Sequence, residues 1–65
     1  MPIVTVSGPP LAIEQKRRLA SGLTQVMCEV YGHPPEHIIV VIRENQPENV
    51  AIGGKLVADR RAQAP

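Results

Sequence analysis

A proline at the second position has the clearest potential for chemistry in this chain. Cells remove an initiator methionine that precedes proline, so the Met1-Pro2 start would yield a secondary amine at the head of the mature chain. An ordinary α-amino group has a pKa near 7.7–8.0, and an apolar pocket or nearby cations would lower it. A base poised near neutral pH can take a proton from the carbon next to a carbonyl. Pro2 is therefore a candidate general base, provided that Met1 is removed.

Three other patterns carry chemistry in other proteins but favour structural roles here. The stretch His33–His37 reads H-P-P-E-H and matches the H-x-x-E-H pattern of some zinc peptidases. That chemistry needs both histidines on one helix face, and two consecutive prolines forbid the helix, so we expect a solvated turn and no metal. Gly53-Gly54-Lys55 lacks the earlier glycine and the Ser/Thr of a phosphate loop, which favours a turn. Cys28 lies inside an apolar helix without a polarising partner, as a structural cysteine does.

The arginines are candidates for binding anions. Arg17 and Arg18 lie early in a helix, where solvated or interface roles are expected. Arg43 ends a strand and has the same parity as Ile39 and Val41, so the three side chains share one face. Anion binding by Arg43 and a salt bridge across an interface both remain open.

The pattern of apolar residues predicts the elements that position these groups. Residues 2–7 alternate as a β-branched strand, which Gly8-Pro9-Pro10 breaks. Residues 12–31 carry apolar side chains at spacings of three and four, which predicts a helix about 30 Å long that ends at Gly32. The apolar stripe comprises Leu19, Ala20, Leu23, Val26, Met27, Val30 and Tyr31.

A second strand and a small hairpin complete the expected fold. Residues 37–44 contain five consecutive apolar residues, the mark of a strand covered on both faces. A strand, a long helix and a strand form a β-α-β unit with parallel strands and a right-handed crossover. Residues 45–49 read as a loop, residues 50–58 as a hairpin or turn around Gly53-Gly54, and residues 59–65 as a loose tail or an arm onto a neighbour. The sequence therefore predicts one α+β domain over residues 1–65.

Composition limits the classes of function. The chain has 65 residues and a net charge of +1, without the basic footprint of a nucleic-acid binder, and Tyr31 is its one aromatic residue. No apolar run reaches the ~18 residues of a membrane span. One cysteine and no signal-peptide core fit a reducing cytoplasm. A domain this small, with no disulfide and an apolar strand to cover, is expected to associate with other copies of itself.

Four segments in register resemble the 4-oxalocrotonate tautomerase family across nearly the whole chain, to about residue 61. They open the chain (residues 2–6), open the long helix (Glu14-Gln15-Lys16), form the second strand (residues 40–44) and lie near the end (residues 52–56). The resemblance implies a β-α-β fold with a C-terminal hairpin, assembled as a homohexamer (a trimer of dimers). It implies Pro2 as the catalytic base and neither a metal nor an organic cofactor. The typical reaction converts 2-hydroxymuconate to its conjugated 2-oxo isomer in the degradation of aromatic compounds.

The chain departs from this family where the substrate is held. Well-known members carry an arginine just before the helix, where this chain has Pro9-Pro10-Leu11 with one residue fewer. They carry a second arginine at the position of Ile39 and a pocket phenylalanine at the position of Val50. A dehalogenating relative uses a carboxylate where this chain has Ile52, which disfavours that chemistry.

These departures leave the substrate clamp open. Ile39, Val50 and Ile52 would line an apolar pocket around Pro2, and the missing cation would come from Arg43, Lys55 or Arg60 of a neighbouring chain. We expect a tautomerase acting on enol or dienol 2-oxo acids. The alternatives are a tautomerase for another keto–enol substrate, and a non-catalytic or hetero-oligomeric subunit of the same fold.

Overall fold

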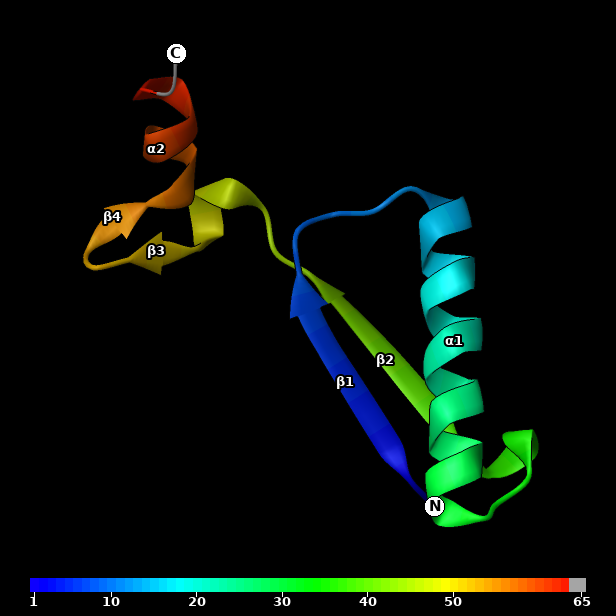
Figure 1. Cartoon of the computed structure of the whole chain (residues 1–65). Coiled ribbons are helices and arrows are strands. Elements are labelled where there is room, and N and C mark those ends of the chain that lie inside the picture. The colour runs from blue at the N-terminus through cyan, green and yellow to red at the C-terminus, as the bar shows by residue number, and fades with distance from the viewer. Residues whose placement is uncertain (64–65) are drawn as a thin grey trace.

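The computed structural model describes residues 1–63, with side chains for residues 1–60. Two lobes follow each other along the chain, and Figure 1 shows them side by side. The first lobe is a β-α-β unit of β1 (Ile3–Gly8), α1 (Ile13–Tyr31) and β2 (Ile39–Glu44). The second is a hairpin of β3 (Ala51–Ile52) and β4 (Lys55–Leu56) that continues into α2 (Val57–Gln63). Short 3-10 helices at Pro35–His37 and Pro47–Asn49 precede β2 and β3.

The two long strands pair in parallel, as the sequence predicts for a β-α-β unit. Ile3 lies opposite Ile39 and Gly8 opposite Glu44. The ladder extends beyond the strands at both ends, because the Ile39 amide donates to the Pro2 carbonyl (3.0 Å) and the Asn45 amide donates to the Gly8 carbonyl (2.8 Å). The register therefore fixes Pro2 beside the start of β2.

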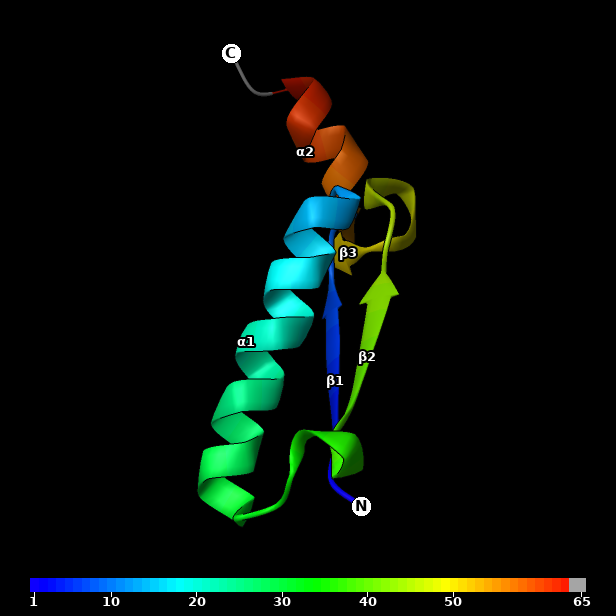
Figure 2. The same cartoon turned by 90° about the vertical axis from the view of Figure 1, so that its right-hand side faces the viewer.

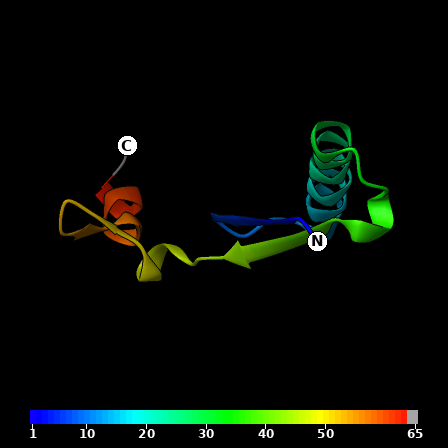
Figure 3. The same cartoon turned by 90° about the horizontal axis from the view of Figure 1, so that it is seen from below.

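Helix α1 covers one face of this sheet, as Figure 3 shows from below. Its boundaries agree with the sequence: Glu14 lies in the first turn, and Gly32 ends the helix with a positive φ of 71°, its amide donating to the Cys28 carbonyl (2.9 Å). The predicted apolar stripe is only partly correct. Leu19, Leu23 and Met27, at spacings of four, are half-buried against the sheet.

The rest of that stripe diverges from the sheet. Val26, Val30 and Tyr31 are 55%, 76% and 56% exposed. At about 100° per residue, Val30 falls between Leu19 and Leu23 around the helix, so it lies on the same side of α1 as they do. It is exposed because the last turns of α1 run away from the two strands (Figure 2), whereas the polar Thr24, nearer the middle of the helix, is half-buried. The helix thus has a second apolar surface that the chain itself leaves uncovered.

The opposite face of the sheet is open. Alternation along paired strands puts Val4, Val6, Val40 and Ile42 under α1, and Ile3, Thr5, Ile39, Val41 and Arg43 on the other face. Ile3 is 56% exposed, and no described segment covers this face. A single chain therefore covers only one face of β2, because two strands and one helix can cover only one side. Cover of the other face by a second copy stays a prediction.

The second lobe corrects the expected C-terminal boundaries. The hairpin forms around Gly53 and Gly54, whose φ values of 62° and 83° are those of a two-residue turn with both central residues left-handed. Residues 57–63 then form α2, so the segment beyond Asp59 begins as a helix rather than as a loose tail. A role as an arm onto a neighbouring copy stays a prediction.

The chain is elongated for its length. Its radius of gyration is 15.6 Å, against about 11 Å for a compact chain of this size. Its accessible surface is 4991 Å², against roughly 4,100 Å² for a compact monomer of the same mass. Figure 2 shows that α2 and the hairpin lie beyond one end of the β-α-β unit. No described residue is fully buried, so the described part of one chain encloses no hydrophobic core of its own. Among the described helices, none has the length and apolar character needed to cross a bilayer.

Candidate active site

Pro2 lies at the amino end of the sheet, immediately before β1. Its side chain is half-buried, and its carbonyl is held by the Ile39 amide at 3.0 Å. Met1, in contrast, is 83% exposed. The ladder therefore fixes the backbone at Pro2, and removal of the exposed Met1 would leave a rigid secondary amine at this edge.

Ile39 is the one predicted pocket residue that the single chain brings to Pro2. It begins β2 opposite Ile3 and contributes to the open, apolar face of the sheet. Apolar surroundings disfavour a cationic amine, which is the environment that a neutral base requires.

Arg43 lies on the same face but at the other end of β2. Four residues of strand separate it from Ile39, a distance of about 13 Å at ~3.3 Å per residue. Its side chain is exposed and makes no ion pair with any residue that the structure describes. Arg43 of one chain is therefore too far along the strand to contact a small substrate at Pro2 of the same chain.

Val50 and Ile52 lie in the second lobe, beyond the carboxyl end of the sheet. Val50 is half-buried and its carbonyl accepts a hydrogen bond from the Val57 amide (2.8 Å), which ties α2 to the base of the hairpin. Ile52 is 54% exposed, and its carbonyl accepts a hydrogen bond from Arg60 Nη2 (3.1 Å). Lys55 pairs with Ile52 across the hairpin. One chain thus separates these groups from Pro2 by roughly the length of β1, about 20 Å.

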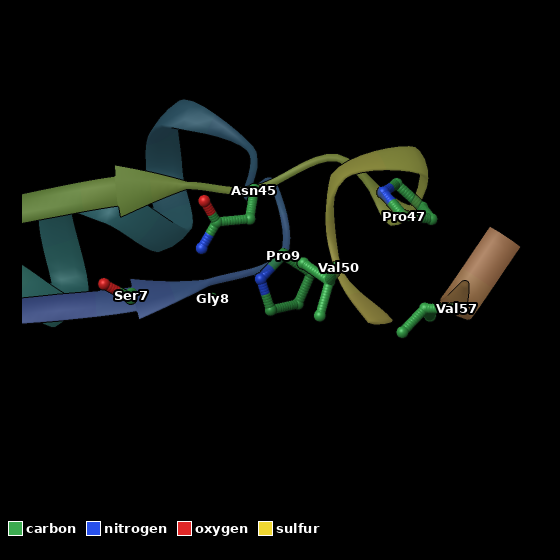
Figure 4. A pocket seen from close by; sticks show the side chains of 7 residues that line it. All are labelled: Ser7, Gly8, Pro9, Asn45, Pro47, Val50 and Val57. Atoms are coloured by element: carbon green, nitrogen blue, oxygen red, sulfur yellow. The ribbon is translucent and has the colours of Figure 1, made fainter. Parts of the chain in front are cut away.

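A cavity of about 250 Å³ opens between the two lobes, as Figure 4 shows. Its wall is mostly apolar, with Pro9 and Val50 facing each other and the Asn45 amide as a polar group. The lining residues are Ser7, Gly8, Pro9, Asn45, Pro47, Val50 and Val57. Sequence reasoning missed this cavity. The available signal was the pair of polar residues Ser7 and Asn45 at the carboxyl ends of two parallel strands, because such ends meet at one edge of the sheet.

A second missed feature holds the first lobe together. Glu44, the last residue of β2, accepts hydrogen bonds from Lys16 Nζ (2.6 Å) and the Leu11 amide (3.0 Å). The Lys16 hydrogen bond, then the Leu11 amide, lowers the pKa of the Glu44 carboxyl from its ordinary value, against a smaller opposing effect of desolvation. This clamp positions the start of α1 but contacts neither Pro2 nor the cavity.

Comparisons with known proteins define the class of this fold. The family model for tautomerase enzymes matches residues 2–60. The chain is 36% identical over 66 residues to a probable tautomerase, K2, of Dickeya dadantii, covering 98% of each protein. The chain therefore belongs to the tautomerase family, as its resemblance to 4-oxalocrotonate tautomerases predicts.

Solved structures confirm the fold. TomN, a 4-oxalocrotonate tautomerase homologue of the tomaymycin biosynthetic pathway, superposes with a TM-score of 0.89 at 32% identity, covering 95% of this chain and 97% of that one. DmpI from Archaeoglobus fulgidus has a TM-score of 0.83 at 43% identity, covering 89% and 100%. A structure described for trans-3-chloroacrylic acid dehalogenase activity has a TM-score of 0.73 at 36% identity, covering 85% and 97%. The β-α-β unit with a C-terminal hairpin is thus the architecture of these tautomerase homologues.

Proposed function

We propose that this chain is a tautomerase whose general base is the Pro2 amine, freed by removal of Met1. The observation that carries the proposal is the position of Pro2: a half-buried proline, held by the Ile39 amide, at the head of a chain whose family match begins at residue 2. The neutral amine accepts a proton from the enol form of the substrate. The resulting ammonium returns a proton to a carbon of the conjugated chain, so the atoms balance and no redox partner is consumed.

The substrate class that we propose is an enol or dienol 2-oxo acid such as 2-hydroxymuconate. The apolar groups predicted for the pocket, Ile39, Val50 and Ile52, would exclude water and strengthen contacts to the developing enolate. The different reactions named for its relatives, in tomaymycin biosynthesis and with trans-3-chloroacrylic acid, fit a fold whose pocket residues select the substrate. The isoleucine at position 52 disfavours the dehalogenase reaction, and a role in aromatic degradation in the cytoplasm stays a prediction.

The active site is proposed to form between copies of the chain. Within one chain, Pro2 and Ile39 lie at the amino end of the sheet, whereas Arg43, Val50 and Ile52 lie toward or beyond its carboxyl end. A second copy that packs on the open sheet face can bring its own hairpin or Arg43 to Pro2. A homohexamer would place every chain in this arrangement. Arg43, Lys55 or Arg60 of a neighbouring copy would then supply the cation that holds the substrate carboxylate.

A specific observation favours a second candidate function. Both positions at which the family's arginines are expected are without charge here, at Ile39 and in Pro9-Pro10-Leu11. A monocarboxylate enol would need one fewer cation, and a non-catalytic subunit that pairs with an arginine-bearing chain would need none. Assay of the purified single chain with enol monoacids and diacids separates these alternatives.

Mass spectrometry and one substitution test the role of Pro2. We expect the mature protein to lack Met1, and Pro2→Ala to lower kcat/KM by at least about a hundredfold, in the range typical of removing a general base. Pro34→Ala, at an exposed proline in the turn after α1, is the matched control and should keep full activity. Because an amine must be unprotonated to accept a proton, kcat/KM of the unaltered protein should rise with pH. Retention of Met1, or an active Pro2→Ala variant, would refute the proposal.

A further inference from the structure

Two imidazoles converge at the turn between α1 and β2. The Nδ1 atoms of His33 and His37 face each other at 3.5 Å, with ring centroids 5.7 Å apart and planes inclined by 52°. Both rings are exposed, and they are the only histidines in the chain. No step of the proposed reaction uses either of them.

The local backbone explains why the rings meet although prolines prevent an α-helix. Gly32 ends α1 in the left-handed region and turns the chain back at His33. Residues 35–37 then form a 3-10 turn in which the His37 amide donates to the Pro34 carbonyl (3.0 Å) and the Ile38 amide to the Pro35 carbonyl (3.1 Å). This 3-10 turn thus brings side chains four residues apart to the same side of the backbone, as an α-helix would. An α-helix, which the prolines forbid, is therefore not the only backbone that brings these two rings together.

The spacing of the two nitrogens matches the coordination sphere of a metal ion. Zinc binds imidazole nitrogen at about 2.0–2.1 Å, so two ligands at the tetrahedral angle lie about 3.3–3.4 Å apart. The observed 3.5 Å needs a movement of only ~0.2 Å. Without a metal, the same approach is explained by one Nδ1–H that donates to the other Nδ1 atom.

We propose that His33 and His37 form a two-ligand site for a divalent transition-metal ion such as Zn²⁺, Ni²⁺ or Cu²⁺, bound through both Nδ1 atoms. Imidazole suits these ions, whereas Mg²⁺ and Ca²⁺ prefer oxygen. Both rings must be neutral, with the remaining proton on Nε2. No third histidine, cysteine or carboxylate of the described residues completes the site, so water fills the other positions.

The site is joined to the strand that holds Pro2. His37 is two residues before Ile39, whose amide binds the Pro2 carbonyl. A metal that bridges His33 and His37 closes the turn between the end of α1 and the start of β2. Because the ion binds the folded turn better than the unfolded chain, it stabilises the folded protein, and the stabilisation grows with the logarithm of the ion concentration above Kd.

Titration of the full chain with Zn²⁺ tests the site. We expect saturable binding of one ion per chain and a melting temperature that rises with Zn²⁺. In nitrogen-15 NMR spectra of the imidazoles, both Nδ1 resonances should shift together at the same Zn²⁺ concentration. His33→Gln and His37→Gln should each weaken binding at least about tenfold, which corresponds to ~1.4 kcal/mol. Mg²⁺ should produce none of these effects.

Cys28→Ala is the matched control, because the half-buried Cys28 thiol is the one thiol in the chain and could itself bind a transition-metal ion. Binding that persists in Cys28→Ala and is lost in both histidine variants supports the site. Three results would overturn the site. They are binding that survives in the His33→Gln/His37→Gln double variant, NMR shifts in only one of the two rings, and failure to saturate by millimolar Zn²⁺. None of these readouts depends on catalysis, so failure of the metal site is distinguishable from failure of the Pro2 proposal.

Discussion

At the scale of single residues, the proposed chemistry depends on Pro2 as a base and on a cation that the positions near Pro2 do not supply. The carbonyl of Pro2 accepts a main-chain hydrogen bond from Ile39, so the position of Pro2 depends on the sheet register. Its nearest predicted pocket neighbour, Ile39, supplies apolar surface but cannot bind a carboxylate. The cations available to an assembled site lie elsewhere: Arg43 on the open face, and Arg60 bound to the Ile52 carbonyl. Substrate preference should therefore respond to a charge introduced beside Pro2.

Ile39→Arg should raise kcat/KM toward a diacid dienol such as 2-hydroxymuconate. A charge-assisted hydrogen bond to a carboxylate contributes ~1.5–3 kcal/mol, which corresponds to about a tenfold to hundredfold increase. Steady-state kinetics of the variant against the unaltered protein measure the effect. Ile39→Gln, which is polar but uncharged, should give no comparable gain. A folded Ile39→Arg variant with unchanged or lower kcat/KM would exclude this position from the substrate site.

At the scale of elements, a few polar contacts and two glycines set the geometry. The Glu44 carboxylate joins the end of β2 to Lys16 and to the Leu11 amide, and so fixes the start of α1 over the sheet. Gly53 and Gly54 reverse the chain within two residues and so determine where Ile52 and Lys55 lie. Each contact acts locally, and each predicts a measurable effect on stability.

The Glu44 clamp predicts a specific loss of stability in acid. The pKa of Glu44 is lowered in the folded protein, so the unfolded chain binds the proton more readily. The stabilisation is present above the ordinary value of 4.5 and is lost as the pH falls through the lower folded-state pKa. Glu44→Gln should make the free energy of unfolding less dependent on pH below about 4.5, and Lys16→Met should act in the same direction. Denaturant titrations from pH 3 to pH 7 measure this, and unchanged pH slopes would contradict the clamp.

The hairpin turn predicts opposite effects for two kinds of glycine. Gly53→Ala and Gly54→Ala should each destabilise the protein by roughly 1–2 kcal/mol, because both residues have a positive φ that a Cβ atom disfavours. Gly22→Ala, in the middle of α1 with open space at the Cβ position, should stabilise it by up to ~1 kcal/mol. Thermal unfolding of the three variants gives the comparison. Equal effects at positions 22 and 54 would show that the turn geometry is wrong.

At the scale of the whole molecule, a single chain is an incomplete unit. It buries no residue fully among those described, exposes Ile3, Val26 and Val30, and is far more extended than a compact chain of its size. The uncovered apolar surface lies on the open sheet face and on the last turns of α1. Association of copies can bury both surfaces and can also bring the second lobe of one chain to Pro2 of another.

Sedimentation should therefore show a species much larger than 7.1 kDa, with six chains as the expected number. Because the folded state is coupled to association, the melting temperature should rise with protein concentration. Ile3→Lys, on the open sheet face, should shift the equilibrium toward smaller species, since it places a charge in the proposed interface. Thr24→Lys is the comparison: Thr24 lies on the half-buried face of α1, so this charge should lower the stability of the fold itself. A stable monomer at micromolar concentration would exclude the proposed assembly.

The sequence by itself determined the β-α-β unit, the hairpin and the family. Periods of 2.0 and 3.6 residues identify strands and helix, Gly32 and Gly53-Gly54 mark their ends, and four short segments in register identify the relatives. These signals are local, so the sequence of a single chain reveals them.

Tertiary structure decided what depends on residues far apart in the chain. Several features follow from how α1 and the second lobe pack: the exposure of Val30, the open face of β2, the Lys16–Glu44 clamp and the cavity at Asn45. The approach of His33 to His37 is local in the chain, but it depends on the backbone conformation of the 3-10 turn between them, which the residue types alone do not reveal. Pro2 and Val50 are separated because strand direction places them at opposite ends of the sheet, so the proposed active site needs a neighbouring copy to bring them together.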